Sequence, residues 1–340
     1  MSRTVVATAP TRIDFAGGTL DIPPLYLFHQ PALTINVAIS LYATVTVRQS
    51  QGRGIRLVAR DQDKQAFWAS ASQIDWRQDR FLELMARFLR AFAPRSAIEM
   101  TTDCQAPAGA GTGGSSALAI AATAALARLG EGRMARPELI EYARAVETQT
   151  IRVPTGYQDY YAAVYGGASV IEFGLAGIVR RSAAGGEFLD ELERHLVVVY
   201  TGKPRFSGAN NWQLFQRHIS GDPKVVRFFE RLKSNAVAMR DAFLDRDLRA
   251  VADMLNEDWA VRRAMLPSMS TPVIDTLIRM SRRAGALGAR VCGAGGGGCI
   301  AFLVDPASRP RLEKLLAGSR ARVLRCRIAR RGLVVREISR

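Results

Sequence analysis

The stretch CQAPAGAGTGGSSALAIAATAALARL, residues 104–129, places a glycine-rich loop directly before a long run of alanine and leucine. Glycine lets a chain turn sharply and bring bare backbone N–H groups against a ligand, and a helix behind the loop adds its positive end. Such a loop typically binds an anion, and phosphate is its natural ligand. The run from about Ser115 to Leu129 is apolar on nearly every face, so we expect a helix buried between layers.

Two other phosphate-binding loops compete with this interpretation. A P-loop requires G-x-x-x-x-G-K-[ST], and residues 104–129 contain no lysine. Gly109, Gly111 and Gly114 satisfy G-x-G-x-x-G, but the dinucleotide-binding unit needs a second strand ending in an acidic residue about 20 residues on. This chain instead enters another helical stretch at Pro137. Both alternatives are disfavoured, while a plain tight turn with close helix packing stays open.

The surrounding sequence predicts a mixed α+β protein of two domains. The first hundred residues are mainly β-branched runs, interrupted by one amphipathic helix over 79–92. The expected strands in this part are 4–10, 33–39, 42–49, 54–61 and 96–103.

A second pattern begins near His195. It predicts a strand over 195–202, three or four helices between Ala209 and Arg283, and then strand, glycine loop, strand and helix. A boundary between Gly174 and Glu193 divides the chain into an N-terminal domain, 1–180, and a C-terminal domain, 181–340.

Composition excludes several classes of protein. The chain of 340 residues is 48% hydrophobic and 23% charged, which is ordinary for a globular protein. It has no apolar run of the ~18 residues that a membrane helix needs and no signal-peptide core, so we expect a cytoplasmic protein without a membrane partner. Its four cysteines lack a C-x-x-C pair, which predicts four buried, reduced thiols rather than a zinc site or disulfides.

The net charge of +16 raises the alternative of a nucleic-acid-binding protein. Residues 308–340 carry eleven Arg or Lys residues against Glu313 and Glu337. Over 320–339 these charges alternate with apolar residues and no aromatic residue is present, which favours a solvated strand face. We therefore expect no nucleic-acid partner, and strongly salt-dependent retention on DNA or RNA would contradict this.

Two further glycine-rich stretches complete the pattern. CGAGGGGCIAFLV, residues 292–304, has five glycines in six residues before a β run, and that loss of backbone entropy favours close approach to a ligand or another loop. PTRIDFAGGTLDIPPLY, residues 10–26, sets Arg12, Asp14 and Asp21 around a glycine pair after a strand. A solvated loop would explain this third stretch equally well if it stood alone.

Together the three stretches resemble the GHMP superfamily of small-molecule kinases, which includes galactokinase, homoserine kinase, mevalonate kinase and phosphomevalonate kinase. The first motif is similar at Pro10, Arg12, Ile13, Phe15, Gly17, Gly18 and Asp21. The second is similar at Pro107, Gly109, Ala110, Gly111, Gly113, Gly114, Ser115, Ser116 and Ala117. The third is similar at Gly293, Ala294, Gly295, Gly296, Gly297, Gly298 and Cys299. One such motif is weak, whereas three in this order along almost the whole chain are specific.

Within the superfamily, RIDFAGGTLDIPPLY, GYQDYYAAVYGG, STPVID and GALGARVCGAGGGG look like stretches of the bacterial heptose kinase branch. That branch commonly has Gly-Gly-Gly-Thr-Asp in its first motif. Here the stretch from Gly17 to Asp21 reads Gly-Gly-Thr-Leu-Asp, with one glycine fewer and one apolar residue more. This departure leaves the identity of the sugar open.

The resemblance implies a two-domain α+β GHMP kinase fold. It pairs an N-terminal α/β domain of the ribosomal-protein-S5-domain-2-like type with a C-terminal ferredoxin-like domain, and the active site lies in the cleft between them. It implies a monomer or homodimer that uses ATP and Mg²⁺ to phosphorylate a hydroxyl of a sugar or sugar phosphate, heptose or heptose 7-phosphate first. A mevalonate- or homoserine-type kinase and a non-catalytic sugar- and ATP-binding sensor are the alternatives.

The resemblance also assigns catalytic and metal-binding residues. Asp159 matches the catalytic aspartate, and its apolar surroundings need a charged partner, for which Arg12 is the candidate. The Mg²⁺ ligands match Ser115 and Glu147. Ser116 remains a second candidate, because many relatives have serine where this chain has Gly114.

Substrate and nucleotide positions follow in the same way. The ATP-binding loop comprises Pro107, Gly109, Ala110, Gly111, Thr112, Gly113, Gly114, Ser115 and Ser116. The acceptor-binding candidates are Asp21, Thr19, Gly18 and Gln158. If the acceptor already carries a phosphate, Lys203 or Arg205 is a candidate anchor.

Overall fold

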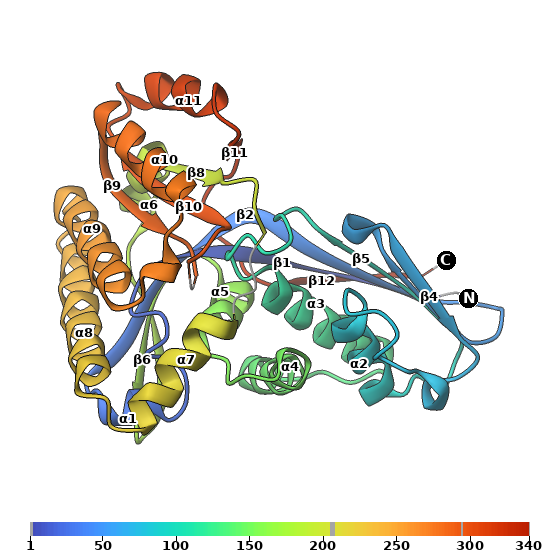
Figure 1. Ribbon diagram of the computed structural model, residues 1–340. Coiled ribbons are helices and arrows are strands. Elements are labelled where there is room, and N and C mark those ends of the chain that lie inside the picture. The colour runs from blue at the N-terminus through green and yellow to red at the C-terminus, as the bar shows by residue number, and fades with distance from the viewer. Residues whose placement is uncertain (1–2, 205–207, 294, 340) are drawn as a thin grey trace.

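Two β-sheets with helices packed on them form the molecule (Figure 1). The computed structural model describes residues 3–204, 208–293 and 295–339. The first sheet has eight strands: β1 (Arg3–Ala16), β2 (Ala32–Gln49), β3 (Ile55–Ala59), β4 (Lys64–Trp68), β5 (Ile98–Cys104), β6 (Ala168–Gly174), β7 (Gly177–Ser182) and β12 (Val334–Ser339). They run in the order β12-β1-β2-β5-β3-β4, and β6 pairs with the first part of β2 and with β7.

Strand β2 is a single long strand where the sequence predicted two, over 33–39 and 42–49. The polar residue Ser40 does not end it, because a second segment of the chain satisfies its polar groups. The Ser40 N–H donates to the Arg327 carbonyl at 2.8 Å, and the Ser40 hydroxyl accepts from the Arg327 N–H at 2.8 Å. The strand therefore continues far enough to pair with both β5 and β6.

The helices of the first half lie on one face of this sheet (Figure 1). They are α1 (Leu25–Phe28), α2 (Glu83–Phe92), α3 (Gly114–Leu129), α4 (Arg136–Ile151) and α5 (Gln158–Tyr165), with short 3₁₀ turns η1 (Arg60–Gln62) and η2 (Ala71–Gln73). Helix α3 is buried between β1, β2 and the other helices, as its apolar composition predicted. Helix α2 begins at Glu83 rather than Asp79, because Asp79 instead closes a turn in which its carboxylate accepts from the Phe81 N–H at 2.8 Å.

The second sheet has four antiparallel strands: β8 (Leu196–Tyr200), β9 (Ala286–Val291), β10 (Cys299–Val304) and β11 (Arg322–Leu324). Their order β11-β8-β10-β9 places them fourth, first, third and second in chain order, as in a ferredoxin-like sheet. The accompanying helices are α6 (Gly186–His195), α7 (Gly208–Ile219), α8 (Pro223–Leu244), α9 (Leu248–Met265), α10 (Pro272–Arg283) and α11 (Arg309–Ala317), with η3 (Pro267–Met269). The predicted mixed α+β fold of two parts is confirmed.

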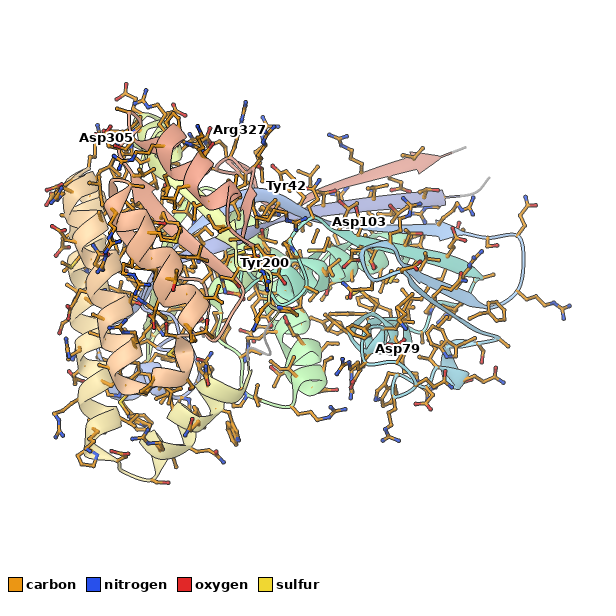
Figure 2. All side chains as sticks on the ribbon, turned by 45° about the horizontal axis from the view of Figure 1, so that its top comes forward. Tyr42, Asp79, Asp103, Tyr200, Asp305 and Arg327 are labelled. Atoms are coloured by element: carbon orange, nitrogen blue, oxygen red, sulfur yellow. The ribbon has the colours of Figure 1, made fainter. Side chains whose placement is uncertain are left out.

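The basic C-terminal segment contributes a strand to each sheet. Strand β11 joins the second sheet, whereas β12 crosses back and pairs with β1 from Arg3↔Ser339 to Thr8↔Val334. Between them, the exposed Arg327 lies at the surface (Figure 2). The division at 180 and 181 stays a prediction, with the qualification that the last strand lies on the first sheet.

The cysteines differ in part from the prediction. None of the four cysteines forms a disulfide bond. Cys292 and Cys299 are buried, but Cys104 and Cys326 are only half-buried, because Cys104 is the last residue of β5 and lines a cleft, and Cys326 follows the short strand β11. Burial still raises the pKa of Cys104 and Cys326 to about 12, so neither is a reactive thiolate near neutral pH.

None of the helices among the described residues has the length and apolar character to cross a lipid bilayer.

Candidate active site

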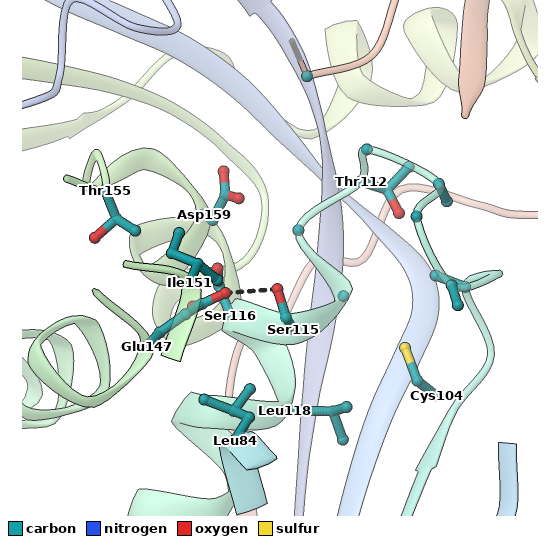
Figure 3. A pocket seen from close by; sticks show the side chains of 18 of the residues that line it. Leu84, Cys104, Thr112, Ser115, Ser116, Leu118, Glu147, Ile151, Thr155 and Asp159 are labelled. Atoms are coloured by element: carbon teal, nitrogen blue, oxygen red, sulfur yellow. Dashed lines mark hydrogen bonds between the residues drawn. The ribbon is translucent and has the colours of Figure 1, made fainter. Parts of the chain in front are cut away.

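A cleft of about 460 Å³ brings the predicted site residues together. The loop 106–113, the first turn of α3, the end of α4 and the start of α5 form its walls (Figure 3). The loop 18–21 closes one end, and Arg262 reaches it from α9. Apolar side chains also line the cleft, beside the polar Asp61, Gln62 and Arg80; they are Ala59, Phe81, Leu84, Met85, Leu118, Ile151 and Val153.

The glycine loop bends through left-handed backbone. Gly109, Gly111 and Gly113 have φ of 68°, 75° and 74°, a region that other residues adopt only with strain. Helix α3 then begins at Gly114 with its N–H groups at the cleft. The loop therefore has the geometry of an anion site at a helix N-terminus, as expected.

The third glycine stretch supports the second one from behind. A Cβ on Gly298 would lie 2.6 Å from the Ala110 carbonyl oxygen, and a Cβ on Gly111 would lie 2.5 Å from the Cys292 carbonyl oxygen. The Cys299 N–H donates to the Ala110 carbonyl at 2.7 Å. The close approach that these glycines permit is thus to another loop. Gly293 lines the cleft, Gly295 and Gly296 pack against Met269, and Ala294 lies outside the described residues.

Ser115 and Glu147 form one polar pair in the cleft. The Ser115 hydroxyl donates to Glu147 Oε1 at 2.5 Å (Figure 3). The Tyr160 hydroxyl donates to Glu147 Oε2 at 2.7 Å. Glu147 is 4% exposed, and burial raises the pKa of its carboxyl group despite these two bonds. Ser116 lies beside the same carboxylate, so it remains a second candidate ligand.

Arg12 and Asp159 form a second pair on the other side of the loop. The Arg12 Nε and Nη2 atoms lie 2.7 and 2.5 Å from Asp159 Oδ1, and Nη1 donates to the Gly111 carbonyl at 2.6 Å. Arg12 is buried, whereas the Asp159 side chain is 24% exposed toward the cleft. A Cβ on Gly113 would lie 3.1 Å from the Asp159 carboxylate, so the glycine loop passes directly over it.

Asp21 lines the cleft, but its carboxylate is already hydrogen-bonded to the backbone. Oδ2 accepts from the Tyr157 and Gln158 N–H groups at 2.7 and 2.9 Å, and Oδ1 accepts from the Thr19 N–H at 3.1 Å. Burial, together with the nearby charges of Asp159 and Asp14, raises the pKa of Asp21 to about 6. Asp21 therefore caps the first turn of α5, the helix that carries Asp159.

The other acceptor-binding candidates lie beside Asp21. Thr19 has φ of 83°, which is rare for a β-branched residue, and its hydroxyl donates to Asn211 Oδ1 at 3.2 Å. Gly18 and Gln158 line the same end of the cleft. Lys203 is exposed and is not among the residues that line the cleft, while Arg205 lies outside the described residues.

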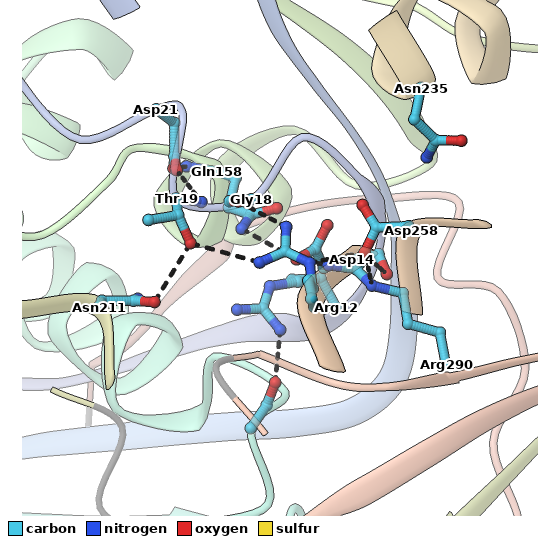
Figure 4. A network of polar contacts seen from close by, with 12 residues as sticks. Arg12, Asp14, Gly18, Thr19, Asp21, Gln158, Asn211, Asn235, Asp258 and Arg290 are labelled. Atoms are coloured by element: carbon cyan, nitrogen blue, oxygen red, sulfur yellow. Dashed lines mark hydrogen bonds and ion pairs between the residues drawn. The ribbon is translucent and has the colours of Figure 1, made fainter. Parts of the chain in front are cut away.

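A buried ion-pair network beneath this loop was missed from the sequence. Arg290 Nη2 lies 2.7 Å from Asp14 Oδ2, Arg290 Nε lies 2.8 Å from Asp258 Oδ2, and Arg262 Nε lies 2.6 Å from that same oxygen (Figure 4). All four side chains are at most 2% exposed. The paired residues lie up to 276 positions apart in the sequence. The only local signals of the network were therefore an arginine inside the apolar strand β9 and the i, i+4 spacing of Asp258 and Arg262.

Comparison with known families gives two matches. Residues 80–167 match the model described as the GHMP kinases N terminal domain, and residues 239–315 match the model described as GHMP kinases C terminal. The first region contains the glycine loop, Glu147 and Asp159. The second contains the network residues Asp258, Arg262 and Arg290.

Individual relatives are similar to this chain over most of its length. A D-glycero-alpha-D-manno-heptose 7-phosphate kinase of Campylobacter jejuni is 26% identical over 319 residues, 92% of this chain and 93% of that protein. A mevalonate kinase of Pyrococcus horikoshii is 24% identical over 251 residues, 72% of this chain and 71% of that protein. The crystal structure of a D-glycero-D-manno-heptose 1-phosphate kinase from Bacteroides thetaiotaomicron has a TM-score of 0.79 at 22% identity, covering 99% of this chain and 100% of that one.

Proposed function

This chain belongs to the GHMP kinase family and is a sugar kinase, and from that premise we propose that it transfers the terminal phosphoryl group of ATP to a hydroxyl of a sugar phosphate. Heptose 7-phosphate, or the free heptose, is the preferred acceptor, because the relative from Campylobacter jejuni is named for that reaction. The proposed location of the reaction is the cytoplasm.

One observation carries the proposal. Two polar pairs, Arg12 with Asp159 and Ser115 with Glu147, flank the start of α3 in a single cleft. Phosphoryl transfer needs cradled phosphates, compensation of their charge, an aligned hydroxyl and stabilisation of the transferring group. The cleft offers one candidate group for each of these four requirements.

The N–H groups of the glycine loop and of the first turn of α3 are proposed to cradle the phosphates of ATP. The apolar side chains of the cleft, including Leu84, Leu118 and Ile151, are proposed to contact the adenine ring. No lysine stands in the loop, so its charge compensation must come from elsewhere.

Ser115 and Glu147 fit a magnesium site. Their oxygens are of the type that Mg²⁺ prefers, and the buried Glu147 carboxylate has a raised pKa that a bound cation would lower. The described residues hold no cluster of three or more His, Cys, Asp or Glu ligands, but Mg²⁺ in kinases commonly takes only one or two protein ligands besides phosphate oxygens and waters. When bound, the ion would neutralise charge on the phosphates.

Asp159 and Arg12 are proposed to act on the reacting atoms. Asp159 accepts a hydrogen bond from the acceptor hydroxyl, aligns its oxygen with the phosphorus atom and takes the proton as the new P–O bond forms. Arg12 holds Asp159 and presents its guanidinium to the transferring phosphoryl group. ADP leaves as the bond to its terminal oxygen breaks.

The acceptor is proposed to bind at the Gly18, Thr19 and Gln158 end of the cleft. Asp21 contributes there by holding the backbone of α5, since its oxygens already accept three N–H groups. Acceptor hydroxyls would then meet the Thr19 hydroxyl and the Gln158 amide.

The test is ADP release measured over a panel of heptoses, other aldoses, their phosphates, mevalonate and homoserine. We expect turnover with a heptose or heptose phosphate, and its loss when Mg²⁺ is chelated. Turnover with mevalonate alone would show that the acceptor is mevalonate rather than a heptose, in line with the mevalonate kinase relative. Clear sugar binding with no turnover of any compound would indicate a sensor and overturn the kinase proposal.

A further inference from the structure

We infer that Arg262, held by Asp258, which Arg290 also contacts, is the positioning residue that fixes the acceptor-binding loop, so that the second half of the chain sets acceptor affinity. The inference rests on the proposed function, because it concerns the same cleft. Arg262 lies on α9, far along the chain from the loop 18–21 that it contacts.

Arg262 joins the two halves of the molecule at the loop itself. Its Nη2 atom donates to the Gly18 carbonyl at 2.6 Å, and its Nη1 atom lies 3.5 Å from the Thr19 hydroxyl (Figure 4). Its Nε atom donates to Asp258 at 2.6 Å. The guanidinium therefore bridges Asp258 on its own helix and the Gly18 carbonyl of the loop. Its planar fork of donors allows this geometry, and a lysine ammonium does not.

The loop needs such a restraint because its backbone is strained. Thr19 is β-branched and has φ of 83°, a conformation that is maintained only when surrounding contacts hold it. Three contacts do so here: Arg262 at the preceding carbonyl, Asp21 at the Thr19 N–H and Asn211 at the hydroxyl. Local strain held from several sides is a common feature of ligand-binding positions.

The network does not have the features of one that serves stability alone. Among the described residues, the Oδ1 atoms of Asp14 and of Asp258 are buried and find no hydrogen-bond donor. A buried ion network left partly unsatisfied stabilises less than an apolar core of the same volume. Its geometry nevertheless fixes two parts of the first glycine motif at once. Arg262 donates to the Gly18 carbonyl, and Arg290 donates to the carbonyl of Asp14, two residues beyond Arg12.

The experiment compares Arg262→Lys with Arg263→Lys, using ATP and D-glycero-D-manno-heptose 7-phosphate. Arg263 is the matched control, since it is the next residue on α9, is 57% exposed and pairs with Asp275. We expect Arg262→Lys to raise KM for the acceptor roughly tenfold and leave KM for ATP within about twofold. The control should change neither. An unchanged acceptor KM in a folded Arg262→Lys protein would overturn the inference.

A second variant keeps the test independent of the stability of Arg262→Lys. Thr19→Gly relieves the strain of the positive φ but also removes a buried side chain and its hydroxyl, so we expect a higher acceptor KM, and the melting temperature records the net change in stability. In the Thr19→Gly background, Arg262→Lys should change the acceptor KM far less than in the wild type, while its effect on melting temperature persists. Equal effects in both backgrounds would show a merely structural role. A wild-type protein without any kinase activity would instead refute the proposed function and leave direct acceptor binding as the readout.

Discussion

Two aspartates that line the cleft, Asp159 and Asp21, have different surroundings. Asp159 faces the cleft and has Arg12 as its charged partner. Asp21 is nearly inaccessible, has no cationic partner among the hydrogen bonds described and is held by backbone N–H groups. The first arrangement suits a group that contacts a reacting hydroxyl, and the second suits a group that shapes the loop around it.

Replacing Asp159 tests the catalytic assignment. Asp159→Asn keeps the shape of the side chain but removes the charge that accepts the proton, so we expect kcat to fall at least ~100-fold. Binding of ATP, measured by titration calorimetry, should stay near wild type. Turnover close to normal would remove Asp159 from its proposed role.

The raised pKa of Asp21 predicts that the stability of the protein depends on pH. Its pKa rises from 3.8 in the unfolded chain to about 6 in the folded protein, so folding favours the protonated form. The stabilisation is complete below pH 3.8 and is lost as the pH rises through about 6, a change of about 3 kcal/mol. Denaturation at a series of pH values should therefore show the free energy of unfolding of Asp21→Asn rising relative to wild type across this window. A constant difference between the two proteins would contradict the assignment.

At the scale of elements, the seam between the two glycine stretches positions the start of α3. Gly298 sits against Ala110 and Gly111 against Cys292, so backbone meets backbone without side chains between. The glycine loop proposed to bind phosphate is consequently supported by a segment almost 190 residues away. We expect this backbone contact to hold the loop in its position at the cleft.

Alanine substitutions can separate backbone strain from loss of this approach. Gly296→Ala and Gly298→Ala both place a Cβ at positive φ, 80° and 77°, which costs about 1–2 kcal/mol. Only at Gly298 would the Cβ also fall 2.6 Å from a carbonyl oxygen, against 3.4 Å at Gly296. We expect both variants to be less stable, with a raised KM for ATP confined to Gly298→Ala. Equal KM values would show that the seam does not position the loop.

The sequence could predict elements whose cause is local. The buried α3 followed from its alanine run, and the glycine positions followed from the turns that they permit. The joining of two predicted strands into β2 could not be foreseen, because Ser40 finds its partner in Arg327. The ion-pair network was hidden for the same reason, since Asp14 and Arg290 are ordinary charges until the fold brings them together.

At the scale of the whole molecule, the halves are tied together at several places, of which two lie apart from the glycine seam and can be tested separately. One is the Arg262 and Arg290 network beneath the cleft, and the other is β12, which leaves the second sheet's side of the molecule to pair with β1. The loop 18–21, the proposed acceptor-binding loop, contacts the first connection through Arg262. A change in the relative position of the halves would therefore first alter the geometry of the proposed acceptor site.

Removing β12 tests the second connection. Deletion of residues 334–340 exposes the edge of β1 and its unpaired backbone groups, so we expect the free energy of unfolding to fall by roughly 3 kcal/mol or more. Urea denaturation measures this change. The control Glu337→Gln removes the exposed ion pairs with Arg3 and Arg128 but keeps the strand, and it should remain close to wild type. A deletion variant as stable as the control would show that β12 is dispensable.

The same strand pairing places the two ends of the described chain next to each other, with Arg3 opposite Ser339 (Figure 1). A short linker could therefore join them without crossing the molecule. The chain could then be opened at the exposed turn 50–53 between β2 and β3, producing a circular permutant with a different order of elements. The cleft would keep every one of its groups, because none of its residues lies in either junction. The linear order of the three glycine motifs would then be a matter of ancestry rather than a requirement of the chemistry.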